Sequence, residues 1–133
     1  NMQGVAQVLA AVKQEAATRA QVKVPTDAVF AALQSAGIEL GHRKQVYAAL
    51  VGAQYCEAAG APGIAVSVCE YRSAEAATKG MAAAGASFKA MAPNVTRTRN
   101  DSTVLTVNRA PAAGSVDPST QIIKVFSTLG GRA

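Results

Sequence analysis

The sequence predicts a single α+β domain over residues 1–133, made of two layers: an antiparallel sheet of four to five strands and helices packed on one face of it. Two pairs of short alternating segments are each joined by residues typical of tight turns, and such segments pair as antiparallel hairpins. Segments with helical apolar spacing precede, separate and follow these pairs. The length of 133 residues also suits one domain.

The composition favours a folded domain whose core is built from small side chains. Half of the residues are apolar and 16% are charged, which argues against disorder. Alanine occupies roughly 30 positions, aromatic residues make up 5%, and tryptophan is absent. Because small side chains bury little area, we expect the core alone to give modest stability.

Apolar residues at helical spacing predict a peripheral first helix over about residues 3–20, with a narrow stripe made by Val5, Val8, Leu9, Val12 and Ala16. Asn1 before Met2 is not a natural translation start. It fits a tag remnant, and this start is compatible with an export segment or lipid anchor upstream. No run of about 18 apolar residues occurs, so we expect no transmembrane segment.

The second helix is predicted to begin at Thr26 as N-cap, with Asp27 in its first turn. Gly37 is placed to end it in the left-handed conformation, so that Ile38 folds back on Leu33. Its buried face is formed by Val29, Phe30 and Leu33. Residues 45–50 remain ambiguous between strand and helix.

The first hairpin joins segments 53–60 and 64–71 through a turn at Pro62-Gly63. Counting outward from this turn places Cys56 directly opposite Cys69, at a non-hydrogen-bonded position where Cα atoms approach to about 4.5 Å. We therefore predict a disulfide that contributes about 3 kcal/mol, and an oxidising compartment for the protein. The alternative is a pair of buried free thiols.

The next elements are a helix and a second hairpin. Ser73 is expected to cap a helix that runs to about Ala84 and ends at Gly85, with Gly80 marking close packing against a neighbour. Segments 95–99 and 102–109 flank the turn residues Asn100-Asp101. The expected core face of this hairpin carries Thr96, Thr98, Thr103, Leu105 and Val107, which leaves Arg97 and Arg99 outward.

The last helix is predicted from Asp117-Pro118, an Asp cap followed by proline at the first helical position. Its apolar stripe consists of Ile122, Val125, Phe126 and Leu129.

The segments Tyr55-Cys56-Glu57 and Val68-Cys69-Glu70-Tyr71, followed by the alanine-rich helix with Gly80, resemble small uncharacterised extracytoplasmic or lipoprotein-type bacterial domains. The resemblance covers about the middle third of the chain. It implies a location in the periplasm or cell envelope and a style of fold, and it carries no catalytic motif.

The basic residues offer one candidate site. His42, Arg43 and Lys44 form a basic turn, and together with Arg97 and Arg99 they would make an anion-binding pocket. The alternative is an ordinary exposed basic turn. The net charge of +5 is spread along the chain, so we expect no specific nucleic-acid binding.

Glu57 and Glu70 fall on one face of the first hairpin as diagonal neighbours, where two carboxylates could do acid–base work or hold a cation. Solvated or salt-bridged side chains are the favoured alternative. The chain has no nucleophile elbow, phosphate-binding loop or dinucleotide fingerprint, and two cysteines with one histidine lack zinc-site spacing. We therefore predict no enzyme, no metal and no cofactor.

These observations favour a non-enzymatic exported domain that binds a protein partner or serves a structural role at the cell envelope. Exposed strand edges and the first helix are the expected contact surfaces, and self-association through an edge strand is possible on the same grounds. The alternative is a small-ligand or anion-binding module that uses the basic pocket.

Overall fold

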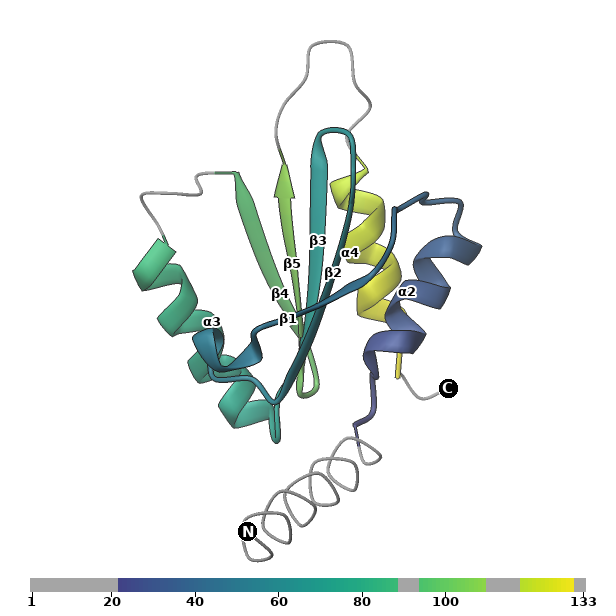
Figure 1. Ribbon diagram of the computed structural model, residues 1–133. Helices are drawn as coiled ribbons and strands as arrows, with labels where there is room; N and C mark the ends of the chain where they lie inside the picture. The colour runs from purple at the N-terminus through teal and green to yellow at the C-terminus, as the bar shows by residue number, and fades with distance from the viewer. Residues whose placement is uncertain (1–21, 89–93, 110–117, 131–133) are drawn as a thin grey trace, which may run out of the picture.

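A five-stranded antiparallel sheet with the order β1-β2-β3-β5-β4 forms the centre of the molecule (Figure 1). The structure is a computed structural model that describes residues 22–88, 94–109 and 118–130. The helix predicted over about 3–20 and the N-terminal Asn1 lie outside the described residues.

The strands are β1 (Lys44–Val46), β2 (Tyr55–Ala61), β3 (Ile64–Glu70), β4 (Val95–Asn100) and β5 (Thr103–Arg109). The helices are α2 (Thr26–Ser35), α3 (Ala74–Phe88), α4 (Ser119–Thr128) and the 3-10 helix η1 (Ala48–Val51). The ambiguous residues 45–50 thus contribute to both a short strand and a helical turn. The predicted α+β class and antiparallel sheet are confirmed.

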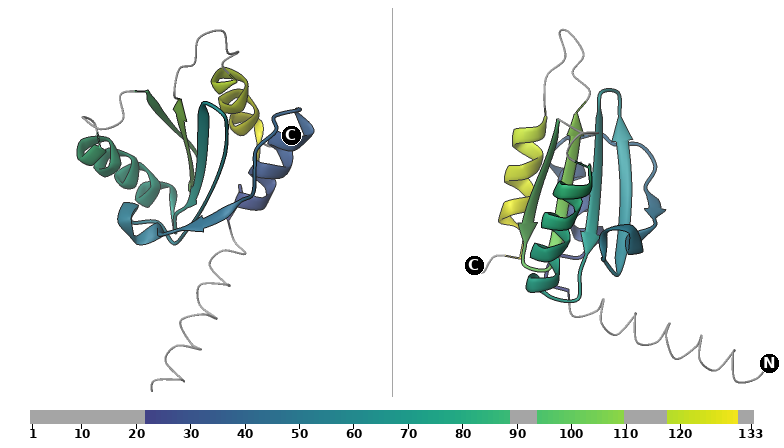
Figure 2. Two further views of the ribbon diagram at one scale, coloured as in Figure 1. Left: turned by 45° about the horizontal axis from the view of Figure 1, so that its top comes forward. Right: turned by 90° about the vertical axis from the view of Figure 1, so that its left-hand side faces the viewer.

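The helices lie on both faces of the sheet, whereas the sequence predicted one face. Helices α2 and α4 cover one face, and α3 packs against β4 and β5 from the other (Figure 2). Strand β5 shows why: Leu105 belongs to the core under α2 and α4, and its neighbour Val104 packs with Ala77 of α3. Successive strand residues point to opposite faces, so a strand with apolar residues in both positions can bury both faces.

The larger core lies between the sheet and the pair α2 and α4. Nine of its side chains are at most 1% exposed. They are Val24, Val29, Leu33, Val66, Val68, Leu105, Val107, Ile122 and Phe126. The predicted stripes of α2 and α4 therefore supply the helical side of this core, and β3 and β5 supply the sheet side.

The register of the first hairpin is as predicted, with Ala61 opposite Ile64 and Cys56 opposite Cys69. In the second hairpin the turn lies one residue later, at Asp101-Ser102, and Asn100 pairs with Thr103. Asp101 takes the positive φ of 55° that this turn requires. Moving the turn by one residue changes the pairing by two, so both faces of the hairpin keep their predicted residues.

The helix ends follow local rules with three differences. Pro118, predicted at the first helical position of the last helix, is the N-cap, and α4 begins at Ser119; the predicted cap Asp117 lies outside the described residues. Gly37 (φ 84°) ends the α2 region, and the Ile38 N–H donates to the Leu33 carbonyl at 3.0 Å, as expected. Thr26 is the first helical residue, whereas the sequence predicted it as N-cap. Ser73 caps α3 by accepting the Ala76 N–H at 3.0 Å. The predicted stop at Gly85 is wrong, because one glycine costs a helix only about 1 kcal/mol and the flanking alanines favour continuation.

Candidate functional site

A disulfide joins Cys56 of β2 to Cys69 of β3, with the two Cα atoms 4.1 Å apart. Both residues are buried on the α3 face, beneath η1 and α3. The short Cα distance is typical of the non-hydrogen-bonded position inferred from the turn. The bond therefore links the two central strands at the level where β1 also pairs with β2.

The five basic residues do not form one pocket. Lys44 lies on β1, and Arg97 and Arg99 lie on β4, which are the opposite edges of the sheet. His42 and Arg43 precede β1 and are therefore also on the far side from β4. The expected pocket required β1 and β4 to be neighbours, but β2, β3 and β5 separate them.

Arg43 is held by two carboxylates instead of facing an open anion site. Its Nε donates to Glu57 Oε1 at 2.7 Å, a second guanidinium nitrogen pairs with Asp27, and the group lies 4.9 Å from the Phe30 ring centroid. The Tyr55 hydroxyl donates to the second Glu57 oxygen. Through these bonds Arg43 links the connector between α2 and β1 to Asp27 of α2 and to Glu57 of β2.

The hydrogen bonds of this network shift the pKa values of Glu57 and Arg43. The hydrogen bond from Arg43 is the largest cause that lowers the pKa of Glu57; burial opposes it, and the Tyr55 hydroxyl adds to the lowering. The bonds to Glu57 and then to Asp27 raise the pKa of Arg43. The result is a partly buried cluster of one guanidinium and two carboxylates, which suits a structural role better than proton transfer.

Glu70 caps α2 from a strand that is distant in the sequence. Its carboxylate is fully buried and accepts the Thr26 N–H at 2.8 Å and the Thr26 hydroxyl at 2.7 Å. A carboxylate at a helix N-terminus satisfies free backbone donors and interacts favourably with the helix dipole. Glu57 and Glu70 do share a face of the sheet, as predicted, but Glu57 binds Arg43 and Glu70 binds Thr26.

The burial of Glu70 was visible in the sequence and was missed. Strand alternation places it on the same face as Val66 and Val68, which form the core under α2 and α4. An acidic residue at such a position requires a donor, and the N-terminus of the nearby α2 supplies it.

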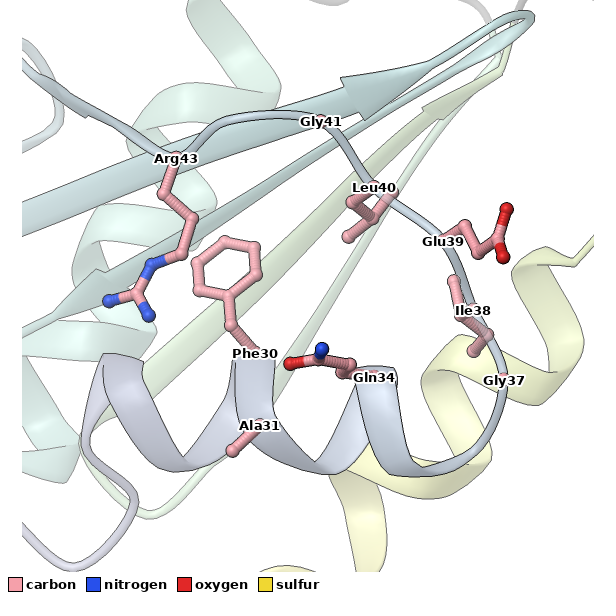
Figure 3. A pocket seen from close by; sticks show the side chains of 9 residues that line it. All are labelled: Phe30, Ala31, Gln34, Gly37, Ile38, Glu39, Leu40, Gly41 and Arg43. Atoms are coloured by element: carbon pink, nitrogen blue, oxygen red, sulfur yellow. The ribbon is translucent and has the colours of Figure 1, made fainter.

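A hollow of about 620 Å³ lies between α2 and the connector that leads to β1 (Figure 3). The ring of Phe30 lies between Leu40 and Arg43, and the carboxylate of Glu39 points outward (Figure 3). Since Arg43 is already paired, few polar groups converge here. The lining consists of Phe30, Ala31, Gln34, Gly37, Ile38, Glu39, Leu40, Gly41 and Arg43.

The large exposed apolar side chains of the described residues lie at the end of β1 and just after it: Val46 ends β1, Tyr47 follows it, and Leu50 belongs to η1 and faces the α3 side. Val46 is 39% exposed, and Tyr47 and Leu50 are each 73% exposed. Within the described ranges β1 pairs only with β2, so its other edge is open. Cys56 is in a non-hydrogen-bonded pair with β3, so its N–H and C=O point away from β3 and toward Val46 of β1. The direction of these backbone groups alternates along a strand. The N–H and C=O of Gln45, the residue before Val46, therefore point away from β2 and out of the sheet.

Two further surveys concern residues 22–88, 94–109 and 118–130 only. No group of three His, Cys, Asp or Glu side chains there is arranged to hold a metal ion. None of the helices in these ranges combines the length and the apolar character needed to cross a bilayer.

Comparison with known proteins adds no relative: no family model, curated protein or solved structure matches the chain.

Proposed function

We propose that this chain is a disulfide-stabilised, extracytoplasmic binding domain that holds an extended segment of a partner protein along β1. The observation that carries this proposal is the combination, at one sheet edge, of outward backbone groups on Gln45 and the exposed side chains of Val46 and Tyr47. An added strand would gain main-chain hydrogen bonds from the edge and apolar contacts from the side chains.

The opposite edge of the sheet has a different character. Strand β4 carries Arg97 and Arg99 between threonines and no large exposed apolar side chain. Charged residues at a sheet edge discourage pairing with another chain. The contrast between the two edges supports β1, and not β4, as the surface for a partner.

Charge indicates what kind of segment would fit. The chain has a net charge of +5, and Lys44 and His42 are exposed beside β1. Arg43 adds no positive charge there, because with Asp27 and Glu57 it forms a group of net charge −1; Lys44 is the cation of β1 left for a partner. We therefore infer a partner strand that alternates apolar and acidic residues.

The extracytoplasmic location rests on the disulfide, because such bonds persist in oxidising compartments. Alkylating free thiols during lysis of the native cells, followed by mass spectrometry of the unreduced protein, tests it. We expect no alkylated cysteine. Alkylation of both Cys56 and Cys69 would contradict the location.

Partner binding is tested with a phage-displayed library of random peptides selected on the oxidised chain. We expect the selected peptides to alternate apolar and acidic residues. The variant Gln45→Pro removes the outward donor without touching the bonds to β2, since proline is tolerated at an edge position whose N–H faces solvent. Binding should be lost in Gln45→Pro and in the pair Val46→Ser with Tyr47→Ser.

The matched control is Gln45→Ala, which shortens the same side chain and keeps the backbone donor. It should bind the selected peptides as the unchanged protein does. Peptides that bind all four proteins equally would show that β1 is not the binding edge, and the proposal would fail.

A further inference from the structure

A second hollow, of about 140 Å³, lies on the α3 face between that helix and the sheet. It is comparable in size to a cavity of about 150 Å³ that holds one benzene molecule. Its lining has a polar part on the sheet and an apolar part on α3 and the strand beneath. The lining residues are Val51, Ser67, Cys69, Tyr71, Gly80, Met81, Ala84, Arg97, Val104 and Thr106.

The polar part is a row across three adjacent strands. Ser67 of β3 pairs with Thr106 of β5, and Thr106 pairs with Arg97 of β4. All three residues line the hollow and are partly buried. Within the described part of the chain, their side chains make no hydrogen bond or ion pair with protein groups. The side chains that line this small space therefore include one guanidinium and two hydroxyls whose donors are unused.

The rest of the lining is apolar or already engaged. Met81 and Ala84 of α3 and Val104 of β5 form the apolar wall. The Tyr71 hydroxyl donates to the Val51 carbonyl at 2.9 Å and is not open to a ligand. Burial raises the pKa of Tyr71, and the charge of Arg97 acts in the opposite direction.

Among the residues that the structure describes, no acidic side chain of this face competes for Arg97. The lining of the hollow contains neither Asp nor Glu. Glu57 and Glu70 point to the opposite face, where Arg43 and Thr26 hold them. On α3, Glu75 is exposed and pairs with Lys79. A cation in a partly buried site without a counter-charge is a good receptor for an anion.

We propose that this hollow binds a small monocarboxylate. Its carboxylate would accept donors from Arg97 and from the hydroxyls of Ser67 and Thr106, and its short apolar body would lie against Met81 and Ala84. A guanidinium matches the planar carboxylate with two parallel bonds, and the volume limits the ligand to a few carbon atoms. The site lies across the sheet from β1 and does not depend on partner binding there.

Butyrate is the probe, titrated into the isotopically labelled oxidised protein while amide chemical shifts are followed. We expect saturable shifts centred on Ser67, Gly80 and Thr106. Acetate should bind more weakly because it lacks the apolar body. Butyramide, which has the same shape without charge, and inorganic phosphate, which has charge without an apolar body, should bind much more weakly still.

The decisive variant is Arg97→Gln, which should weaken butyrate binding at least about tenfold, since a hydrogen-bonded charge is lost. Arg99→Gln is the matched control: Arg99 lies two residues along the same strand, is exposed, and donates to the Asp101 carbonyl. It should change the affinity by less than about twofold. Should Arg97→Gln not fold, Thr106→Val removes one hydroxyl at constant shape and should also weaken binding.

The proposal fails if butyramide or phosphate binds as well as butyrate. It also fails if Arg97→Gln and Arg99→Gln have equal effects, or if the shifts centre elsewhere. If no selected peptide binds at β1 while butyrate binding is observed, the partner proposal alone is overturned.

Discussion

The two faces of the sheet are stabilised in different ways. On the α2 and α4 face, large side chains such as Leu33, Leu105 and Phe126 are fully buried and fill the space between helix and sheet. On the α3 face, the buried cluster consists of Cys56, Cys69, Tyr71, Ala77 and Val104. It holds one disulfide and one ring, and hollows remain beside it. The first face depends on packed volume, and the second depends on a covalent link.

The difference follows from helix composition. Helix α3 is rich in alanine and contains Gly80, whose added Cβ would clash with the Tyr71 hydroxyl and ring. Small residues let a ring approach the helix backbone, but they fill little space elsewhere. This arrangement leaves room for a ligand and requires another source of stability, which the disulfide supplies.

The largest effect is expected from removing the covalent link. Replacing both cysteines, as Cys56→Ala with Cys69→Ala, should lower the free energy of unfolding by about 3 kcal/mol, because the unfolded chain regains the entropy of a short loop. Urea denaturation measures this. A loss below about 1 kcal/mol would mean that the α3 face is stabilised mainly by packing, contrary to the comparison.

A matched pair of truncations on β5 compares the two faces directly. Val107 is 1% exposed under α2 and α4, and Val104 is 4% exposed beside the hollow under α3. Val107→Ala should cost about 2 kcal/mol, since it opens a cavity in a filled core, and Val104→Ala about 1 kcal/mol, since its surroundings are already loosely filled. Equal losses in thermal or urea unfolding would remove the distinction between the faces.

The sequence predicts local features of this fold better than its long-range arrangement. Pro62-Gly63 sets the register that brings Cys56 to Cys69, and Gly37 ends α2 as expected, because both depend on neighbouring residues alone. The order of strands is decided by packing between distant segments. For that reason the sequence did not predict that Arg43 and Arg97 lie at opposite edges, or that α3 covers its own face.

The candidate sites also divide into those that depend on neighbouring residues and those that depend on the packing of distant segments. The disulfide was predictable from one turn, and the position of Glu70 inside the sheet was predictable from strand alternation. The row of Ser67, Thr106 and Arg97 requires knowledge that β5 lies between β3 and β4. The sequence places these three residues on separate segments with no shared motif.

The contact between Gly80 and Tyr71 gives a smaller expected effect. Gly80→Ala gains about 1 kcal/mol of helix propensity, but its methyl group would displace a buried ring that is bonded to the Val51 carbonyl. We expect a net loss of about 1 kcal/mol in urea unfolding. In a Tyr71→Ala background the same change should become stabilising, and a loss in both backgrounds would show that the ring is not the cause.

The smallest expected effect is electrostatic and concerns the α2 and α4 face. Arg43 is the main cause that lowers the pKa of Glu57 in the folded protein. The ionised Glu57 therefore stabilises the fold fully above the ordinary glutamate pKa of about 4.3. This stabilisation is lost as the pH falls through the lowered pKa of the folded state. Glu57→Gln should cost about 1 kcal/mol at neutral pH and flatten the acid limb of the stability profile.

Asp27→Asn provides the control for this network, because Asp27 pairs with the same guanidinium from an exposed position. It should leave the acid limb nearly unchanged, since exposed ion pairs contribute little. If instead Glu57→Gln and Asp27→Asn flatten the plot of stability against pH equally, the burial of Glu57 does not strengthen its ion pair with Arg43. The α2 and α4 face would then depend on volume alone, and its contrast with the disulfide-linked face would become sharper.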